Sequence, residues 1–374
     1  MNSNPFDIAI VGAGIVGLAH AWMAARKGWR VVVIEKDRFC QGASIRNFGF
    51  VTVTGQRAGD TWRRARVSRD LWIEIAQAAH IDICHRGLLV VGHRQNAGKV
   101  LEAFKASEMG QECELLSASE VAHHYPEVRS QGIWGGLYSP HELRVESRDA
   151  IPQITQWLKD TYDVHFLFEQ ELLEVSMPLL RTAKMEIVAD RLILATGTEL
   201  SGVALPYLKD RGVSLTQLQM LRIQPPSGFK MQAAVMSDLS LVRYAGYTGL
   251  QAHHSLLDEI NRECQESLEA GIHLITVQSL DGSIVVGDSH HPAHETGPFS
   301  QERVDQLILK HLSETLQLNN YSMVERWTGR YPVMPGEQDA LILAPTPDIR
   351  VVSVVSGTGA STAFGIAQDV VNHW

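Results

Sequence analysis

A glycine turn near the start of the chain constrains the fold more than any other feature. It follows the short apolar run Asp7–Val11 and opens an apolar helical pattern to about Lys27, and its glycines have the spacing G-x-G-x-x-G. A second apolar run, Arg30–Ile34, follows and leads to Glu35. A strand, a turn, a helix and a second strand form a βαβ unit, in which the two strands are parallel. We therefore predict that the chain opens with a Rossmann-type dinucleotide-binding unit.

Each part of this unit has a physical role in binding a dinucleotide. Gly12 permits the tight turn, Gly14 lets the backbone approach a pyrophosphate, and Gly17 lets the helix pack on the strand. The unpaired N–H groups at the start of the helix attract phosphates, and Glu35 accepts hydrogen bonds from an unphosphorylated ribose. The alternative is a glycine-rich turn that binds nothing. The neighbouring cofactor candidates are Ile15, Val16 and Lys36.

Three features favour FAD over NAD as the dinucleotide. The glycine fingerprint lies at the very start of the chain, and a second cluster, GASIRNFG at Gly42–Gly49, follows soon after Glu35. An apolar run near residue 190 ends in the sequence ATG, at Ala195–Gly197, which brings backbone close to the dinucleotide. A glycine turn before an apolar helix also closes the chain, at Ser356–Val371.

Composition excludes several classes of function. The chain has 374 residues, 45% hydrophobic content and a net charge of -9, which gives no global attraction for nucleic acid or anionic lipid. Its 4 cysteines show no CxxC spacing, as expected for reduced thiols in a cytoplasmic protein. No apolar stretch is long enough to span a bilayer. His290, His291 and His294 have no convincing set of partner ligands, so we predict no metal site. The oligomeric state is left open.

The order of apolar runs predicts a discontinuous two-domain chain. Runs typical of parallel strands occur at the start, near residue 190 and at the end, whereas Leu215–His290 has the pattern of a mostly antiparallel layer. We also expect Met185–Val188 and Arg191–Leu194 to pair as two strands. The predicted cofactor domain covers 1–85, 146–214 and 326–374, and the substrate domain covers 86–145 and 215–325.

The whole set of motifs resembles the glutathione-reductase-type flavoproteins. Within them it is similar to the D-amino-acid oxidase superfamily, which includes glycine oxidase and sarcosine oxidase. The resemblance rests on GAGIVG, GASIRN, LILATG, the SGTG turn and the final helix. It implies an α/β fold, with an FAD-binding Rossmann domain joined to a mostly antiparallel β-sheet substrate domain of α+β type.

This resemblance also implies where the cofactor lies. FAD would lie extended, with its pyrophosphate on the first turn and its isoalloxazine near the last, where the helix dipole stabilises the anionic reduced flavin. For Arg46 and Asn47 the alternative is ordinary turn and capping chemistry. In this family some members attach the flavin through a Cys, at a position where this chain has Gly329, so we expect non-covalent FAD. The implied contacts are Gly42, Ala43, Ser44, Arg46, Asn47, Leu172, Ala195, Thr196, Gly197, Gly357, Thr358, Gly359, Ala360, Ser361 and Thr362.

The chain departs from its relatives in the residues that select the substrate, because the usual carboxylate clamps are missing. An oxidase for small amino acids holds the carboxylate with a cation, ideally an Arg fork. Where relatives carry a GxRP segment, this chain has Tyr331 before Pro332, with Arg330 displaced by one position. Relatives also have a cation in the last turn, where Ala360 and Phe364 stand here. Simple α-amino acids are therefore disfavoured.

A narrower resemblance is to the flavin-dependent amine oxidases of aminophosphonate catabolism. It rests on GASIRNFG, HELRVESRDAI, RYAGY, VVGDSHH and GRYP. Its implied substrates are 2-aminoethylphosphonate and its N-methyl derivative, and Asp288 could orient the amine. A strand-end turn remains the alternative for Asp288 to His290, and packing remains one for the tyrosines. The phosphonate candidates are Arg46, Arg243, Tyr247, His290, Arg330 and Tyr331.

The predicted reaction is therefore FAD-dependent oxidation of a C–N bond, for which no protein acid or base is strictly required. Phosphonoacetaldehyde would form, ammonia or methylamine would leave, and oxygen is the expected acceptor, with a quinone left open. Two alternatives remain: an oxidase or dehydrogenase for glycine, sarcosine or a D-amino acid, and a flavin-binding module without catalysis.

Overall fold

The computed structural model describes residues 5–297, 299–336 and 338–374. Its first sheet is built from short apolar strands that come from the start, the middle and the end of the chain. In spatial order they are β18 (Ala340–Thr346), β19 (Ile349–Val354), β11 (Leu192–Leu194), β1 (Ile8–Val11), β2 (Val31–Ile34) and β7 (His165–Leu167). Neighbouring strands are parallel except for the pair β18 and β19. The carboxyl ends of β1, β2, β11 and β19 therefore lie along one edge of this sheet.

Helices bury their apolar faces against one face of the first sheet and form one core with it. Glycine lets α1 pack closely on the turn before it and α10 pack closely on α2. A Cβ on Gly17 would lie 1.9 Å from the carbonyl oxygen of Gly12, and a Cβ on Gly365 would lie 2.5 Å from the carbonyl oxygen of Arg64. Trp22 and Trp72 pack edge-on against the buried ring of Phe364, with centroids 5.3 and 5.2 Å away. The helices are α1 (Ile15–Arg26), α2 (Asp60–Ala78), α5 (Ser147–Tyr162) and α10 (Gly359–Asn372).

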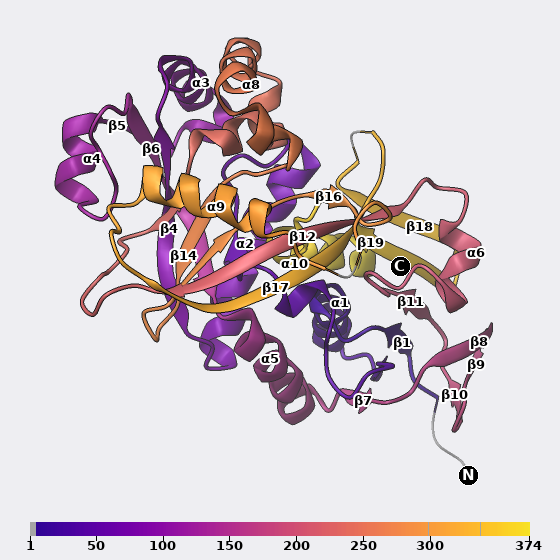
Figure 1. Cartoon of the computed structure of the whole chain (residues 1–374). Coiled ribbons are helices and arrows are strands. Elements are labelled where there is room, and N and C mark those ends of the chain that lie inside the picture. Colours follow the sequence, from indigo (N-terminus) through magenta and orange to yellow (C-terminus); the bar gives the residue numbers. More distant parts are fainter. Residues whose placement is uncertain (1–4, 298, 337) are drawn as a thin grey trace.

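The second sheet is larger and almost entirely antiparallel, and only the pair β13 and β4 runs parallel. Its long strands β12 and β17 cross the middle of the molecule (Figure 1). In spatial order it contains β16 (His291–Pro292), β12 (Ser214–Gln224), β15 (Ile284–Gly287), β14 (Ile275–Gln278), β13 (Ala234–Met236), β4 (Ile83–Gly92), β6 (Gly135–Val145) and β3 (Phe50–Val51). Strand β17 (Ser322–Val333) extends it beside β12, and β5 (Glu114–Ser117) beside β6.

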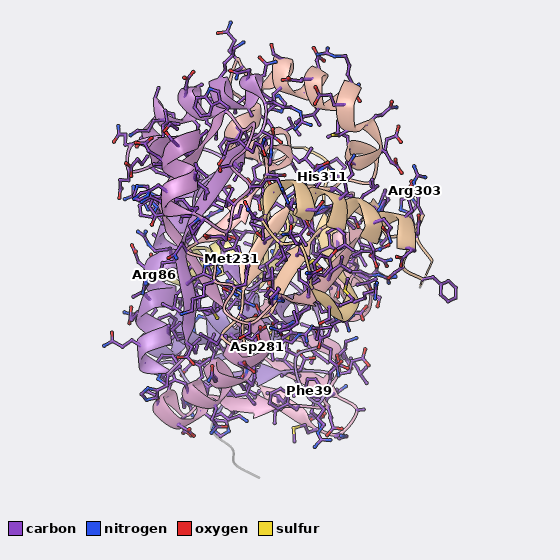
Figure 2. The ribbon with its side chains drawn as sticks, turned by 60° about the vertical axis from the view of Figure 1, so that its left-hand side comes forward. Phe39, Arg86, Met231, Asp281, Arg303 and His311 are labelled. Atoms are coloured by element: carbon purple, nitrogen blue, oxygen red, sulfur yellow. The ribbon has the colours of Figure 1, made fainter. Side chains whose placement is uncertain are left out.

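Amphipathic helices pack around the second sheet. Helix α9, which carries the labelled Arg303 and His311 in Figure 2, contacts β12 and β15. The buried imidazole of His311 bonds to the hydroxyl of Ser267 in α8 at 2.8 Å, which ties the two helices together. The sequence analysis did not predict α3. The helices near this sheet are α3 (Gln95–Lys105), α4 (Ala118–His124), α7 (Ala245–Thr248), α8 (His253–Glu269) and α9 (Glu302–Thr315).

The predicted pairing of Met185–Val188 with Arg191–Leu194 is wrong. The first segment contains β10 (Glu186–Val188), which pairs with β9 (Leu179–Thr182) in a small antiparallel sheet with β8 (Leu172–Ser176). Leu192–Leu194 instead forms β11, between β1 and β19. Burial explains the difference, because β11 is apolar and buried throughout, whereas β10 alternates between exposed and buried residues.

The α/β fold class is confirmed, with parallel strands in the first sheet and a mostly antiparallel second sheet. Strand β3, which lies well inside the predicted cofactor range 1–85, pairs with the second sheet, and so does all of β17, which crosses the predicted boundary between 325 and 326. The exact domain boundaries stay a prediction. The short helix α6 (Leu205–Leu208) follows the first sheet's β11. In the described part of the chain, no helix combines the length and apolarity needed to cross a membrane.

Candidate active site

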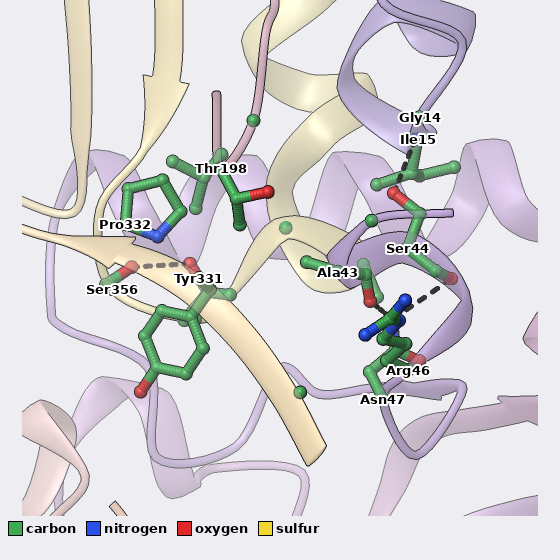
Figure 3. A pocket seen from close by; sticks show the side chains of 18 of the residues that line it. Gly14, Ile15, Ala43, Ser44, Arg46, Asn47, Thr198, Tyr331, Pro332 and Ser356 are labelled. Atoms are coloured by element: carbon green, nitrogen blue, oxygen red, sulfur yellow. Dashed lines mark hydrogen bonds between the residues drawn. The ribbon is translucent and has the colours of Figure 1, made fainter. Parts of the chain in front are cut away.

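A cavity of about 760 Å³ runs from the glycine turn after β1 to the turn before α10. Its volume is within the range of about 300–1,000 Å³ that is usual for small-molecule and cofactor sites. Residues from both sheets line it, so the second sheet supplies one wall of a cavity that begins at the edge of the first. Figure 3 shows Gly14 and Ser44 near one another in this cavity, with Tyr331 at a distance from them.

The first end of the cavity is held in shape by Gly12 and Glu35. Gly12 has a φ of +104°, and a Cβ there would lie 2.4 Å from the carbonyl oxygen of Ala195. The Glu35 carboxylate accepts hydrogen bonds from the N–H of Ala13 at 2.8 Å and of Asp37 at 3.0 Å. A carboxylate has about four acceptor positions, so Glu35 is oriented by backbone and can still accept hydroxyl donors.

The turn around Ser44 closes against the start of α1. The Ser44 hydroxyl accepts a hydrogen bond from the N–H of Ile15 at 2.9 Å, and a Cβ on Gly14 would lie 2.9 Å from the same oxygen (Figure 3). The Asn47 amide donates to the carbonyl oxygens of Ala43 and Ser44 at 2.9 and 3.2 Å. Its oxygen accepts from the Gly49 N–H at 2.6 Å, so Asn47 holds the turn, as the capping alternative expected.

The second end of the cavity contains the N-terminus of α10. Gly357 has a φ of +75°, and a Cβ there would lie 2.8 Å from the Tyr331 ring. The N-cap Thr358 makes no side-chain capping bond, so the first N–H groups of the helix, at Gly359 and Ala360, face the cavity without an intrahelical acceptor. Two helix N-termini and a glycine cradle thus line one elongated cavity, which fits an extended anionic dinucleotide.

A cluster of polar and aromatic side chains forms the wall supplied by the second sheet. Asp288 follows β15 and is only 4% exposed, and the Nε2 atoms of His273 and His290 lie 3.1 and 3.6 Å from its two carboxylate oxygens. The two imidazoles stack with centroids 5.0 Å apart, and His290 also meets Tyr331 edge-on at 5.9 Å. Tyr244 meets His273 edge-on at 5.5 Å.

Burial controls the protonation of this wall. It raises the pKa of the Asp288 carboxyl to about 7, against the opposing effect of the Arg243 guanidinium. Burial likewise holds the pKa of His273 and of His290 well below the usual value, and Arg243 lowers both further. Burial also raises the pKa of Tyr331 to about 12. Both imidazoles are therefore neutral, and the carboxyl titrates near neutral pH.

Most of the predicted site residues line this cavity. They are Gly12, Gly14, Ile15, Val16, Glu35, Lys36, Gly42, Ala43, Ser44, Arg46, Asn47, Ala195, Thr196, Gly197, Arg243, Asp288, His290, Arg330, Tyr331, Gly357, Thr358, Gly359, Ala360 and Ser361. Lys36 forms an ion pair with Glu199 at 3.0 Å, and the Nε of Arg330 donates to the Gln217 side chain at 2.8 Å.

Some predicted residues do not line the cavity. Tyr247 is 1% exposed and packs against Phe104 at 4.8 Å, so its ring belongs to the core of the second sheet, as the packing alternative expected. Phe364 lies between Trp22 and Trp72 in the core of the first sheet, so it does not replace a substrate clamp. The other residues outside the lining are Gly17, Leu172 and Thr362.

His273 and Tyr244 both line the cavity and were not among the predicted site residues. His273 immediately precedes an apolar strand, and no motif distinguishes it from a core histidine. Tyr244 was noticed within the segment RYAGY, but Tyr247 was chosen instead. Cys40 also lines the cavity, and burial raises the pKa of its thiol to about 11, which keeps it protonated.

The chain is similar in sequence or in fold to several known proteins. The chain is 22% identical over 202 residues to monomeric sarcosine oxidase from Bacillus sp. (strain B-0618), and the match spans 52% of this chain and 52% of that protein. The structure is similar to glycine oxidase from Bacillus cereus ATCC 14579, with 14% identity, a TM-score of 0.77 and coverage of 98% of this chain and 94% of that one.

A third relative has a structure with the cofactor in place. L-α-glycerophosphate oxidase from Mycoplasma pneumoniae with FAD bound has 16% identity, a TM-score of 0.74 and coverage of 100% of this chain and 96% of that one. Residues 7–373 match the family described as DAO, FAD dependent oxidoreductase, which is nearly the whole chain. The chain therefore belongs to the DAO family of FAD-dependent oxidoreductases.

Proposed function

We propose that this oxidoreductase uses non-covalent FAD to oxidise the C–N bond of a short aminophosphonate. The substrate is 2-aminoethylphosphonate or its N-methyl derivative, and the products are phosphonoacetaldehyde and ammonia or methylamine, with oxygen as the electron acceptor. Bound FAD supplies the hydride acceptor. The observation that carries the proposal is that Arg243 and Asp288 lie on the same wall of the cavity, while the start of α10 carries no cation.

The arrangement of charge suits a substrate with an amine at one end and a large anion at the other. Asp288 is the carboxylate on this wall, and Arg243 and Arg46 are exposed arginines that line the same cavity. Arg330 also lines it, but its Nε is engaged by Gln217. A doubly charged phosphonate needs several donors spread over a wider area than a carboxylate does, and guanidinium groups provide them.

The relatives support both this reading and an amino-acid alternative. L-α-glycerophosphate oxidase shows by its name that a substrate with a phosphate group is compatible with this fold. Sarcosine oxidase and glycine oxidase act, by their names, on small amino acids, and a carboxylate could equally pair with Arg243. An amino-acid oxidase is therefore the second candidate function.

Turnover on matched substrates tests the proposal. Initial rates of oxygen consumption are measured with 2-aminoethylphosphonate, its N-methyl derivative, glycine, sarcosine, D-alanine and 3-aminopropanoate, the last being the carboxylate analogue of the phosphonate. We expect the two phosphonates to have the highest kcat/KM. Oxidation of glycine, sarcosine or D-alanine without oxidation of either phosphonate would contradict the proposal and support the second candidate.

A substitution in the closing turn provides a separate prediction. Ala360→Arg places a guanidinium at the N-terminus of α10, on the cavity wall where this chain has no cation. An Arg there can hold a small carboxylate near the closing turn, so the ratio of kcat/KM for sarcosine to that for the aminophosphonate should rise about tenfold or more. The control adds an Arg at an exposed position away from the cavity, Glu74→Arg on α2, because an Arg at a buried position of α10 such as Ala367 would disrupt the core. An unchanged ratio in Ala360→Arg would count against the placement of the substrate beside α10.

A further inference from the structure

The buried cluster of Asp288, His273 and His290 is not explained by holding the cofactor. We propose that Asp288 is the catalytic group that accepts the proton of the substrate's ammonium group, and that His273 and His290 position it. This inference rests on the proposed oxidation of an amine, but it does not depend on which anion the substrate carries.

Amine oxidation needs a neutral nitrogen, because the lone pair must form the new C=N bond as the hydride leaves. An alkylammonium group resembles that of lysine, whose pKa is about 10.4, so at pH 7.5 only about one molecule in 1,000 is neutral. A buried proton acceptor, in a cavity where burial and the nearby Arg243 guanidinium lower the pKa of the bound amine, lets the abundant ammonium form bind and lose its proton there. It must be ionised when the substrate arrives and must keep the proton while the carbon is oxidised.

The geometry of Asp288 meets these requirements. The carboxylate is buried on the cavity wall, and its Oδ1 has no hydrogen-bond partner, since the 3.1 Å approach of the His273 Nε2 lacks hydrogen-bonding alignment. Oδ1 is therefore buried without a hydrogen bond that would compensate its charge, while the residue lines the cavity, where a ligand can approach the carboxyl. A buried carboxylate without compensation is costly, so a cationic donor is the partner that it favours.

The two imidazoles explain how the proton is kept. The Nδ1 of His290 bonds to the carbonyl oxygen of Gly271 at 3.0 Å, so that nitrogen carries the ring proton and Nε2 presents a lone pair towards Asp288. A protonated Asp288 therefore has a lone pair of His290, and not a second N–H donor, 3.6 Å from its Oδ2. The other charged or titratable groups around the carboxyl are Arg243, Tyr244 and Tyr331. Arg243 is the group that favours the ionised form, and burial favours the protonated one.

The proposed sequence balances in atoms and electrons. An N–H bond of the ammonium breaks, and the proton moves to an oxygen of Asp288. The adjacent C–H bond then breaks, and its electron pair leaves with the hydrogen to FAD while the nitrogen lone pair forms the C=N bond. Water adds to the iminium and releases the protonated amine. Oxygen takes the hydride equivalent from the reduced cofactor and the proton held by Asp288 to give hydrogen peroxide, which restores the carboxylate.

The same three residues could instead bind a divalent cation, because their donor atoms lie within 4.8 Å of one another. Two observations favour the proton acceptor. A histidine that binds a metal normally donates its other ring N–H to a partner, but the buried Nδ1 of His273 has none. The Arg243 guanidinium also acts on the same carboxylate and would oppose a second fixed cation.

The test is the pH dependence of flavin reduction in Asp288→Asn, measured by anaerobic stopped-flow with the best amine substrate of the native enzyme. In the native enzyme the reduction rate should rise around pH 7 and then level off. In the variant it should fall about 1,000-fold at pH 7.5 and recover progressively as the pH approaches 10, where the free amine itself loses its proton. Asp258→Asn, an exposed position on α8, is the control and should follow the native profile.

Binding supplies a readout that does not require turnover. Ethylphosphonate, which lacks the amine, should perturb the flavin spectrum of Asp288→Asn with the native Kd, which shows that the cavity is intact. A variant whose reduction rate keeps the native dependence on pH would overturn the proposal. Loss of native activity after dialysis against EDTA, with recovery on adding Zn²⁺, would overturn it in favour of a metal site. If no aminophosphonate reduces the flavin but another amine does, the proposed substrate fails while this inference is still tested.

Discussion

Arg243→Met is expected to lower kcat/KM for an anionic amine by about 10- to 150-fold, mostly through KM. This range corresponds to the loss of hydrogen bonds to a charged group, which are worth about 1.5–3 kcal/mol. Arg243 lines the cavity beside Asp288 and Tyr331. Among the lining residues described for the second sheet's wall, Asp288 is the acidic one, so no further carboxylate there competes with the substrate's anion for the Arg243 guanidinium. Methionine keeps much of the apolar stem of the side chain and removes only the fork of donors.

Two controls separate a lost anion clamp from general damage. At a pH well above the pKa of Asp288 in both proteins, propylamine, which has no anionic group, should be oxidised by Arg243→Met about as slowly as by the native enzyme. Arg330→Met should have a smaller effect, because the Nε of Arg330 already donates to Gln217. Equal losses for propylamine and for the aminophosphonate would show that Arg243 supports the structure of the wall and does not bind the anion.

The same variant has a second expected effect, on the pH profile. Arg243 holds the pKa of Asp288 below the value that burial alone would give, so its removal should raise that pKa. The carboxylate form is the proton acceptor, and it exists only above its pKa. The rise of flavin reduction with pH should therefore move to higher pH in Arg243→Met. An unchanged pH profile would show that Arg243 does not influence the ionisation of Asp288.

The end of the cavity at the first sheet could be predicted from sequence, because the carboxyl ends of neighbouring parallel strands meet at one edge of a sheet. The first glycine turn, Glu35, Ala195–Gly197 and the closing turn each follow the carboxyl end of a strand. Strands β1, β2, β11 and β19 are parallel neighbours, so those ends meet at one edge. Apolar runs and glycine spacing marked the segments, and the resemblance to the flavoproteins implied the role of the closing turn.

The substrate wall could not be predicted in the same way. Asp288 and His273 are separated along the chain and meet because β14 and β15 are antiparallel neighbours, with Ile275 opposite Gly287. That register is set by packing of the whole sheet, and no local motif records it. In the segment RYAGY, Arg243 and Tyr244 line the cavity, whereas Tyr247 is buried in the core.

Phe364 shows how an aligned position can mislead. Its place in the final helix suggested a replaced carboxylate clamp, but it packs between two tryptophans on the side of α10 that faces the helices of the first sheet. Ala360, one turn earlier, is the residue that lines the cavity. Which face of α10 meets the cavity depends on how α1 and α2 pack against it. That packing is tertiary structure and cannot be recognised in the local sequence of the helix.

Gly12→Ala is expected to yield protein that is purified without flavin. The residue has a φ of +104°, which strains any L side chain, and the new Cβ would lie 2.4 Å from the backbone oxygen of Ala195. Backbone atoms cannot rotate away, so either the turn or β11 must move. Strain of this kind costs about 1–3 kcal/mol, and a turn displaced to relieve it would weaken FAD binding roughly 100-fold.

Gly28→Ala is the matched control, because Gly28 also has a positive φ, +79°, but a Cβ there would meet nothing within 4 Å. It carries the conformational strain without the clash at the cofactor turn. The ratio of flavin to protein absorbance after purification should be near zero for Gly12→Ala and native for Gly28→Ala, and added FAD should raise the Tm of the latter only. Native flavin content in Gly12→Ala would mean that the turn after β1 tolerates a side chain, and the dinucleotide would then have to be held mainly by Glu35 and the closing turn.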